Sequence, residues 1–315
     1  MEKNNYNKLK DERIETIKNS EQTREVTEIN KYKNLHDTLL FFIKTMRFFN
    51  GYKINIMGNI PEIGERPIII APNHLRKQDI EIIMEAFPGH TALLSGDYEN
   101  VHGNINGFML EKNGIIYFDM EDKEDRNNVK YVINDVLTNG INLLWFYEGS
   151  WNLSPNKPYY DGNHYIVQAA IDANALILPV SFEMIDKNMY VNFSDFIDYR
   201  AICGNTQLSN EEKIEALDIL KGLIGAGLFD IWEKYARVER DSLSEDYWEK
   251  YIEEVLSEWK FTEEDIERKH FVDKSYIDPT DVYSHLENLE VNKNNAFLLS
   301  KKLHLNWCFF YCVVK

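Results

Sequence analysis

The segment NHLRKQD at residues 73–79 carries the residue types best suited to acid–base chemistry in this chain. An apolar run at residues 68–71 precedes it and predicts a buried strand, so we expect His74 where that strand ends. Asp79 begins a helical apolar pattern, and an intervening turn would fold its carboxylate back onto the imidazole ring. A carboxylate that orients a histidine makes a general base. The simpler alternative is that Asp79 only caps the helix and His74 is an ordinary turn residue.

A second polar segment, FYEGS at residues 146–150, follows another apolar run in the same way. Because ligands of α/β sheets bind beyond the strand ends, we expect Glu148 either to accept hydrogen bonds from a substrate or to organise backbone N–H groups. Gly149 would let a ligand approach the main chain. Ser150 does not resemble a hydrolase nucleophile, because the Gly-x-Ser-x-Gly pattern is absent.

The elements that must position these segments are short β-branched and aromatic runs alternating with helical patterns. We expect strands at residues 52–57, 67–71, 91–95, 115–118, 141–146, 176–182 and 189–193, and helices at 79–87, 125–139 and 165–173. This alternation predicts an α/β fold, with a mostly parallel or mixed sheet flanked by helices.

Two acidic helical stretches follow, at residues 209–235 and 245–270. Ser209 and Glu212 have the spacing of a capping box at the start of the first. Three glycines, among them Gly227, lie inside the apolar period of this helix and follow no strand. This placement favours close helix packing over a nucleotide-binding loop.

Composition and charge limit the function classes. The chain has 315 residues, 44% of them hydrophobic, and a formal net charge of −17, which disfavours nucleic-acid binding. Cys203, Cys308 and Cys312 are too few for a disulfide framework, and two thiols with no nearby histidine pair do not make a zinc site. The first 34 residues lack the apolar core of a signal peptide, so we expect a cytoplasmic location.

The most apolar stretch near the start, at residues 39–49, contains several Leu and Phe residues. Lys44 and Arg47 interrupt it, so it is too short to span a bilayer. Its composition suits a helix that lies in the membrane interface, and the alternative is a helix packed against the protein core.

Taken together, five segments resemble the glycerolipid acyltransferase family, which contains 1-acylglycerol-3-phosphate acyltransferase. NHLRKQD is similar to the family's first motif, NHxxxxD, and NGIIYFD at residues 113–119 is similar to its second. FYEGS looks like the third motif, usually FPEGT, and ILPV at 177–180 looks like the fourth. VNFSDFI at 191–197 resembles the strand and turn that close the domain, so the resemblance covers about residues 35–200.

The resemblance implies transfer of a fatty acyl group from acyl-CoA or acyl-carrier protein to the hydroxyl of a lysophospholipid. It implies that His74 is the general base, that Asp79 orients it, and that no metal or bound cofactor is needed. It also implies peripheral docking of residues 39–49 on the inner face of the membrane. The residues expected to contact substrates are Asn73, Arg76, Lys77, Gly114, Glu148, Gly149, Ser150, Trp151 and Pro179.

The chain departs from the family pattern at two positions. Phosphate-accepting members usually have Arg after the second and third motifs, where this chain has Met120 and Trp151. Each lost charge-assisted contact would weaken phosphate binding by about 1.5–3 kcal/mol, unless Arg76, Lys77, Lys123 or Arg126 substitutes. Of these four cations, Lys123 and Arg126 are more typical of solvated surface charge.

These departures leave two alternatives open beside the lysophospholipid acceptor. One is an acyltransferase for a phosphate-free acceptor, such as a glycolipid or natural-product alcohol. The other is a non-catalytic lipid- or acyl-CoA-binding protein, which would not need both His74 and Asp79. The predicted organisation is an N-terminal polar segment and interfacial helix at residues 1–50, an acyltransferase domain at 51–200, and an acidic helical extension at 201–315.

Overall fold

The computed structural model describes residues 2–19, 21–96, 98–102, 105–153, 159–204, 206–235 and 247–257. The helices are α1 (Glu2–Asn19), α2 (Arg24–Tyr32), the short 3₁₀ helix η1 (Lys33–Leu35), α3 (His36–Asn50), α4 (Asp79–Ala86), α5 (Tyr98–Val101), α6 (Ile105–Asn113), α7 (Lys123–Thr138), α8 (Tyr165–Asp172), α9 (Tyr199–Cys203), α10 (Asn210–Tyr235) and α11 (Tyr247–Ser257). The strands are β1 (Lys53–Met57), β2 (Ile68–Pro72), β3 (Thr91–Ser95), β4 (Ile115–Tyr117), β5 (Asn142–Leu144), β6 (Leu176–Ile185) and β7 (Asn188–Phe193). These elements confirm the predicted α/β fold.

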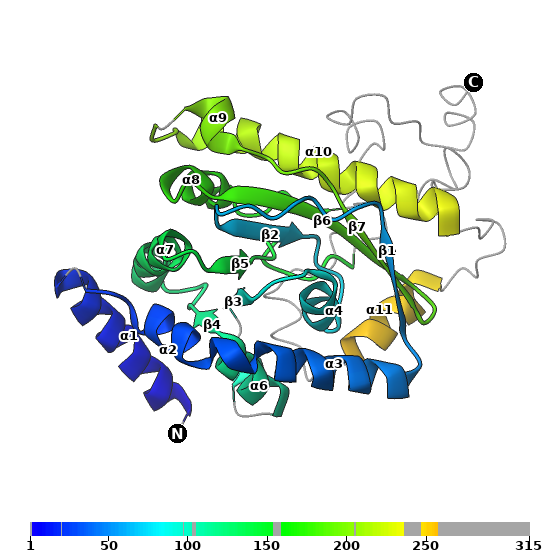
Figure 1. The fold of residues 1–315 in the computed structure, drawn as a ribbon, viewed down its shortest axis with the longest axis horizontal. Coiled ribbons are helices and arrows are strands. Elements are labelled where there is room, and N and C mark those ends of the chain that lie inside the picture. Colours follow the sequence, from blue (N-terminus) through cyan, green and yellow to red (C-terminus); the bar gives the residue numbers. More distant parts are fainter. Residues whose placement is uncertain are drawn as a thin grey trace.

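The strands form one sheet in the order β1-β7-β6-β2-β5-β3-β4. Every neighbouring pair is parallel except β6 and β7, which form an antiparallel hairpin. Strands β6, β2, β5, β3 and β4 therefore point the same way, and their carboxyl ends share one edge of the sheet. Figure 1 shows helices on both faces of this sheet.

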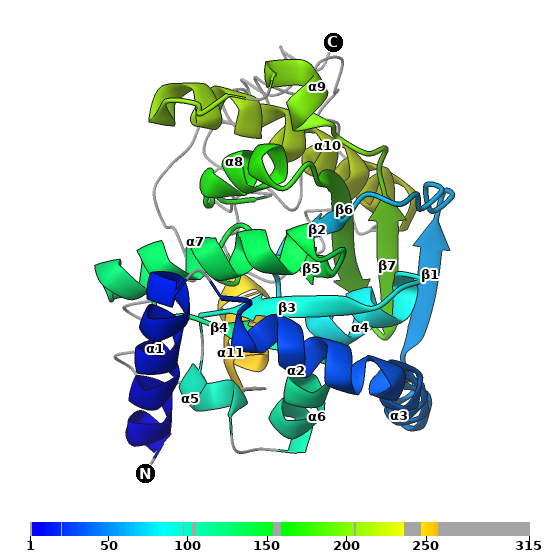
Figure 2. The same cartoon turned by 60° about the vertical axis from the view of Figure 1, so that its left-hand side comes forward.

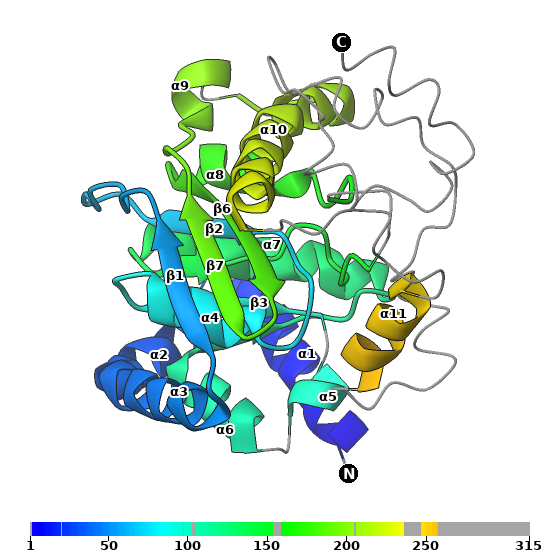
Figure 3. The same ribbon diagram turned by 90° about the vertical axis from the view of Figure 1, so that its right-hand side faces the viewer.

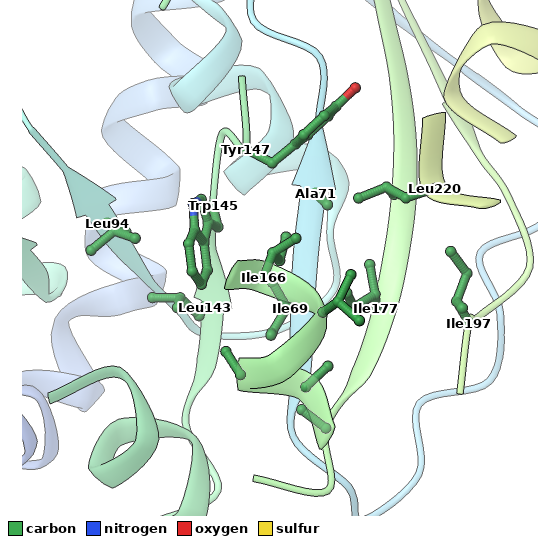
Figure 4. Packing of buried hydrophobic residues seen from close by; sticks show 14 of the residues in the cluster. Ile69, Ala71, Leu94, Leu143, Trp145, Tyr147, Ile166, Ile177, Ile197 and Leu220 are labelled. Carbon is green, nitrogen blue, oxygen red and sulfur yellow. The ribbon is translucent and has the colours of Figure 1, made fainter. Parts of the chain in front are cut away.

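Alternating side chains of the buried strands supply both sides of the core. Ile69 and Ala71 of β2 face a cluster that includes Ile166 of α8 and Leu220 of α10 (Figure 4). Ile68 and Ile70 face the opposite cluster, to which α3 and α4 contribute. Strand β2 is buried along its whole length, which explains the continuous apolar run in its sequence.

Helix α10 approaches the sheet closely, and a glycine makes this possible. A Cβ atom at Gly227 would collide with Oγ of Ser181 on β6. The Ser181 hydroxyl donates to the carbonyl oxygen of Ile224 at 2.7 Å. The close-packing interpretation is therefore confirmed for Gly227. The capping box is also present, since the Ser209 N–H donates to Glu212 and the Glu212 N–H donates to Ser209.

The N-terminal helices are joined to the sheet region by a buried ion-pair network. Arg13 of α1 donates to Asp125 of α7 at 2.8 Å, to Glu25 of α2 at 2.9 Å, and to the carbonyl oxygen of Tyr117 at 2.7 Å. Figure 2 shows α1 beside α7, in agreement with their packing contacts. Asp125 also accepts from the backbone N–H of Asp119 at 2.7 Å, so the network holds the loop that follows β4.

Helix α3 buries one side and exposes the other. Leu39 and Ile43 are buried in the core, whereas the exposed apolar side chains are Phe41, Phe42, Met46, Phe48 and Phe49. The cationic residue Arg47 is not part of this exposed apolar surface. Its guanidinium donates two hydrogen bonds of 2.8 Å to Glu85 of α4. None of the helices in the described part of the chain is long and apolar enough to cross a membrane.

Helix α11 is the described part of the second acidic helix that we predicted at residues 245–270. In Figure 3, α11 lies on one side of the view, and β1 and α3 lie on the other. The rest of that prediction, together with Cys308 and Cys312, lies outside the described residues.

Candidate active site

Asn73 fixes the turn that leaves β2. Its side-chain amide donates to the carbonyl oxygen of Phe182 at 3.0 Å, and its side-chain oxygen accepts from the N–H of Phe182 at 2.7 Å. The side chain is fully buried. Asn73 therefore ties the start of the loop to β6, and its described contacts are with main chain.

His74 and Asp79 meet as the sequence predicted. Nδ1 of His74 lies 3.0 Å from Oδ2 of Asp79. The same oxygen accepts from the backbone N–H of Leu75 at 2.8 Å and of Arg76 at 3.2 Å. These donors belong to the loop before α4, so Asp79 folds the loop back instead of capping its own helix. Because a carboxylate only accepts hydrogen bonds, Nδ1 carries the hydrogen and Nε2 keeps its lone pair.

Two aromatic rings surround the imidazole. The ring of Phe146 lies against it, with centroids 4.1 Å apart, and Trp151 meets it edge-on at 6.1 Å. The His74 side chain remains 16% exposed, whereas Asp79 is 0% exposed. The Asp79 carboxylate is therefore shielded from solvent, whereas the His74 ring remains partly accessible to it.

Glu148 accepts backbone hydrogen bonds from two separate segments of the chain. Its Oε1 accepts from the His74 N–H at 3.1 Å, and its Oε2 accepts from the Tyr160 N–H at 2.7 Å. Burial raises the pKa of Glu148 to about 8, and the hydrogen bonds from Tyr160 and His74 oppose that rise. Of the two roles that we expected, these contacts fit the organisation of backbone N–H groups.

The loops after β4 and β5 approach each other beside this group. A Cβ atom at Gly149 would lie 3.6 Å from Cε of Met120, and one at Gly96 would lie 2.6 Å from its Cγ. Gly149 has φ +71°, which favours glycine. Arg126 is exposed and donates to the carbonyl oxygen of Met120, so its guanidinium holds the loop that carries the methionine. Ser150 follows in the same turn and is partly exposed.

The two cations of the His-Asp loop are placed differently. Arg76 is 3% exposed, and its Nη1 lies 3.3 Å from Sδ of Met184 on β6. Lys77 is partly exposed, and its charge opposes the rise that burial produces in the pKa of Glu81. Lys77 is thus the more accessible of the two.

Gly114 and Pro179 do not join the group around His74. Gly114 precedes β4, at the sheet edge opposite the carboxyl ends, and a Cβ atom there would lie 2.6 Å from Cγ1 of Ile29. Its φ of +118° also requires glycine. Pro179 is buried in β6 opposite Ala71, and its carbonyl oxygen accepts from Ser194. Their contacts give both residues a role in packing the fold.

Three contacts of the site were not foreseen from the sequence. The N–H of Asn152 donates to the carbonyl oxygen of His74 at 2.7 Å, Tyr160 donates to Glu148, and Tyr251 of α11 lies near Arg76. The first two are main-chain contacts that any residue type could make, and the third joins residues far apart in the chain. Among the described residues, no group of three or more His, Cys, Asp and Glu side chains could hold a metal ion.

Comparisons with known proteins give one family match and a similar solved structure. Residues 52–183 match the family model described as Acyltransferase. A solved structure, the 1-acyl-sn-glycerophosphate (LPA) acyltransferase PlsC from Thermotoga maritima, is similar with 18% sequence identity and a TM-score of 0.49, over 66% of this chain and 82% of that one. No curated protein matches the sequence significantly. The family match over residues 52–183 supports acyl transfer as the activity.

Proposed function

We propose that this protein transfers a fatty acyl group from acyl-CoA or acyl-carrier protein to the hydroxyl of a lysophospholipid, with His74 as general base. The observation that carries the proposal is the hydrogen bond of 3.0 Å between Nδ1 of His74 and Oδ2 of Asp79. It fixes the tautomer in which Nε2 can accept a proton. The partly exposed ring gives an acceptor hydroxyl access to that nitrogen.

In the proposed reaction the acceptor hydroxyl gives its proton to Nε2 while its oxygen attacks the thioester carbonyl. The new C–O bond forms a tetrahedral intermediate, which collapses as the C–S bond breaks. The imidazolium then returns the proton to the departing thiolate, so no covalent acyl-enzyme is needed. A positioned base contributes about 10²–10⁴-fold to such a step, and alignment of the two substrates supplies much of the rest.

A second candidate acceptor is a lipid alcohol or glycolipid without a phosphate. The observation that favours it is the presence of apolar or aromatic residues in the loops beside His74, at positions where phosphate-accepting acyltransferases usually have Arg. Met120 borders Gly149 and Trp151 borders the imidazole, so neither position supplies a cation. For the lysophospholipid acceptor, Lys77 and Arg76 are the nearest cations in sequence to His74.

Helix α3 is the proposed membrane-docking element. Five apolar side chains on it, each at least half exposed, would enter the lipid interface. Helix α3 packs against α4, which begins at Asp79, so docking there would keep the site near the bilayer that holds the acceptor. With a net charge of −17, the attraction would be hydrophobic and local.

The experiment that tests the function follows release of free CoA from acyl-CoA with a panel of acceptors. The panel holds lysophosphatidic acid, lysophosphatidylcholine, monoacylglycerol and a monoacylated glycolipid. We expect acceptor-dependent CoA release with at least one of them. If release of CoA from acyl-CoA, and of free carrier protein from acyl-carrier protein, is no faster than without acceptor, a non-catalytic binding protein is favoured.

A further inference from the structure

Helix α11 packs onto the residues beside His74. Val255 is fully buried against Trp151 and Leu153, and Tyr251 and Ile252 pack around the same cluster. Trp151 is itself the residue that meets the imidazole edge-on. A helix from the C-terminal extension therefore forms part of the surroundings of the candidate base.

The same helix brings an aromatic ring near the buried cation of the His-Asp loop. The guanidinium carbon of Arg76 lies 6.0 Å from the centroid of the Tyr251 ring. Arg76 is two residues from His74 in sequence and is 3% exposed. Its charge also lowers the pKa of Glu183, which burial raises. Arg76 is thus a buried cation with an aromatic ring near it, two positions after the proposed base in the chain.

We propose that Tyr251 of α11 is a specificity-determining residue that controls access of an acceptor phosphate to Arg76. This inference rests on the proposed function and concerns its two acceptor classes. With the ring in place, contact between an acceptor phosphate and the guanidinium is restricted. When the ring is absent or displaced, the guanidinium can hold a phosphate group.

The physical basis is competition for one cation. An aromatic ring and a phosphate both bind a guanidinium, but the phosphate does so through charge-assisted hydrogen bonds, which are stronger and directional. A centroid distance of 6.0 Å is at the outer limit of a cation–π contact, so the ring is a weak partner for the cation. The other residues of α11 in the apolar cluster around Trp151 are Ile252, Val255 and Leu256.

The test compares binding of two short acceptors that differ only in the phosphate, 1-hexanoyl-glycerol 3-phosphate and 1-hexanoylglycerol. Calorimetry without an acyl donor gives the Kd ratio for the full chain. We expect Tyr251→Ala to shift this ratio toward the phosphate-bearing acceptor by about tenfold or more, the size of one charge-assisted contact. Tyr251→Leu, which keeps apolar packing but loses the ring, should shift it in the same direction.

Two matched variants serve as controls. Tyr251→Phe keeps the ring, and Glu253→Ala changes an exposed residue of the same helix, so both should leave the ratio within about twofold of wild type. Adding Arg76→Met to Tyr251→Ala should remove the gain. An unchanged ratio in both Tyr251→Ala and Tyr251→Leu, or a gain that survives loss of Arg76, would overturn the proposal. Because no donor is present, these outcomes are independent of whether the protein transfers acyl groups.

Discussion

The side-chain carboxyl group of Glu148 holds the main chain of His74, since its Oε1 accepts the His74 N–H at 3.1 Å. The ring of the same histidine is held separately by Asp79. Two carboxyl groups from different loops therefore fix one residue, one through the backbone and one through the side chain. Loops from the ends of β2 and β5 meet in this way because those strands are parallel neighbours.

Burial of Glu148 should make stability depend on pH. Its pKa rises from 4.5 to about 8 in the folded protein, so between these values the folded state binds more protons than the unfolded state. The free energy of unfolding therefore falls as pH rises through this window. Glu148→Gln cannot titrate and should reduce the slope, measured by urea denaturation from pH 5 to 8. The same slope in wild type and variant would contradict the account.

Asp79→Asn should impair catalysis more than folding. The amide can present N–H toward Nδ1, which disfavours the tautomer that leaves Nε2 free. We expect kcat to fall by about 10²-fold or more, with a smaller effect on the KM of the acceptor. Steady-state kinetics measure the two constants. A variant that keeps wild-type kcat would show that Asp79 only stabilises the loop conformation, by accepting the backbone N–H groups of Leu75 and Arg76.

Gly227→Ala should destabilise the protein although alanine is the better helix former. Propensity alone predicts a gain of about 1 kcal/mol, but the added methyl group meets Ser181 on β6. Overpacking of this kind costs about 1–3 kcal/mol, so the free energy of unfolding should fall. Adding Ser181→Gly should recover part of the loss. A more stable Gly227→Ala variant would show that α10 can shift away from the sheet.

Membrane docking through α3 should depend on its exposed phenyl rings. Phe41→Glu combined with Phe48→Glu removes two side chains that are 66% and 75% exposed. Since burial of a Phe side chain is worth roughly 1.5–3 kcal/mol, we expect vesicle binding to weaken at least about tenfold in a flotation assay. Asn34→Glu with Thr38→Glu adds the same charge at exposed polar positions and is the matched control. Equal binding by both double variants would argue against this docking surface.

Local patterns in the sequence were sufficient to predict most of the sheet. Strand β3 lies where its β-branched and apolar run predicted it, at Thr91–Ser95. Strand β5 is shorter than predicted, because Trp145 and Phe146 already enter the loop that carries Glu148. Strand β6 is longer, since it continues to Ile185 in the hairpin with β7. The extension of β6 therefore comes from pairing with the strand that follows it directly in the chain.

In the candidate site too, some contacts could be predicted from the sequence and others could not. The His74–Asp79 contact was predictable, because a short loop after a strand limits where the carboxylate can lie. The sequence allows two roles for Glu148, since residue type alone does not show which groups donate hydrogen bonds to its carboxyl group. The packing of Tyr251 near Arg76 had no sequence signal, because 175 positions separate them and only the folded chain brings them together.

The most direct test of the account replaces the proposed base. With donor and acceptor both present, His74→Ala should lower kcat by about 10²–10⁴-fold, while the free energy of unfolding and the KM of the acceptor change little. Steady-state release of CoA, compared with wild type at equal folded concentration, measures this. A His74→Ala variant that turns over at the wild-type rate would contradict the assignment of His74 as the general base.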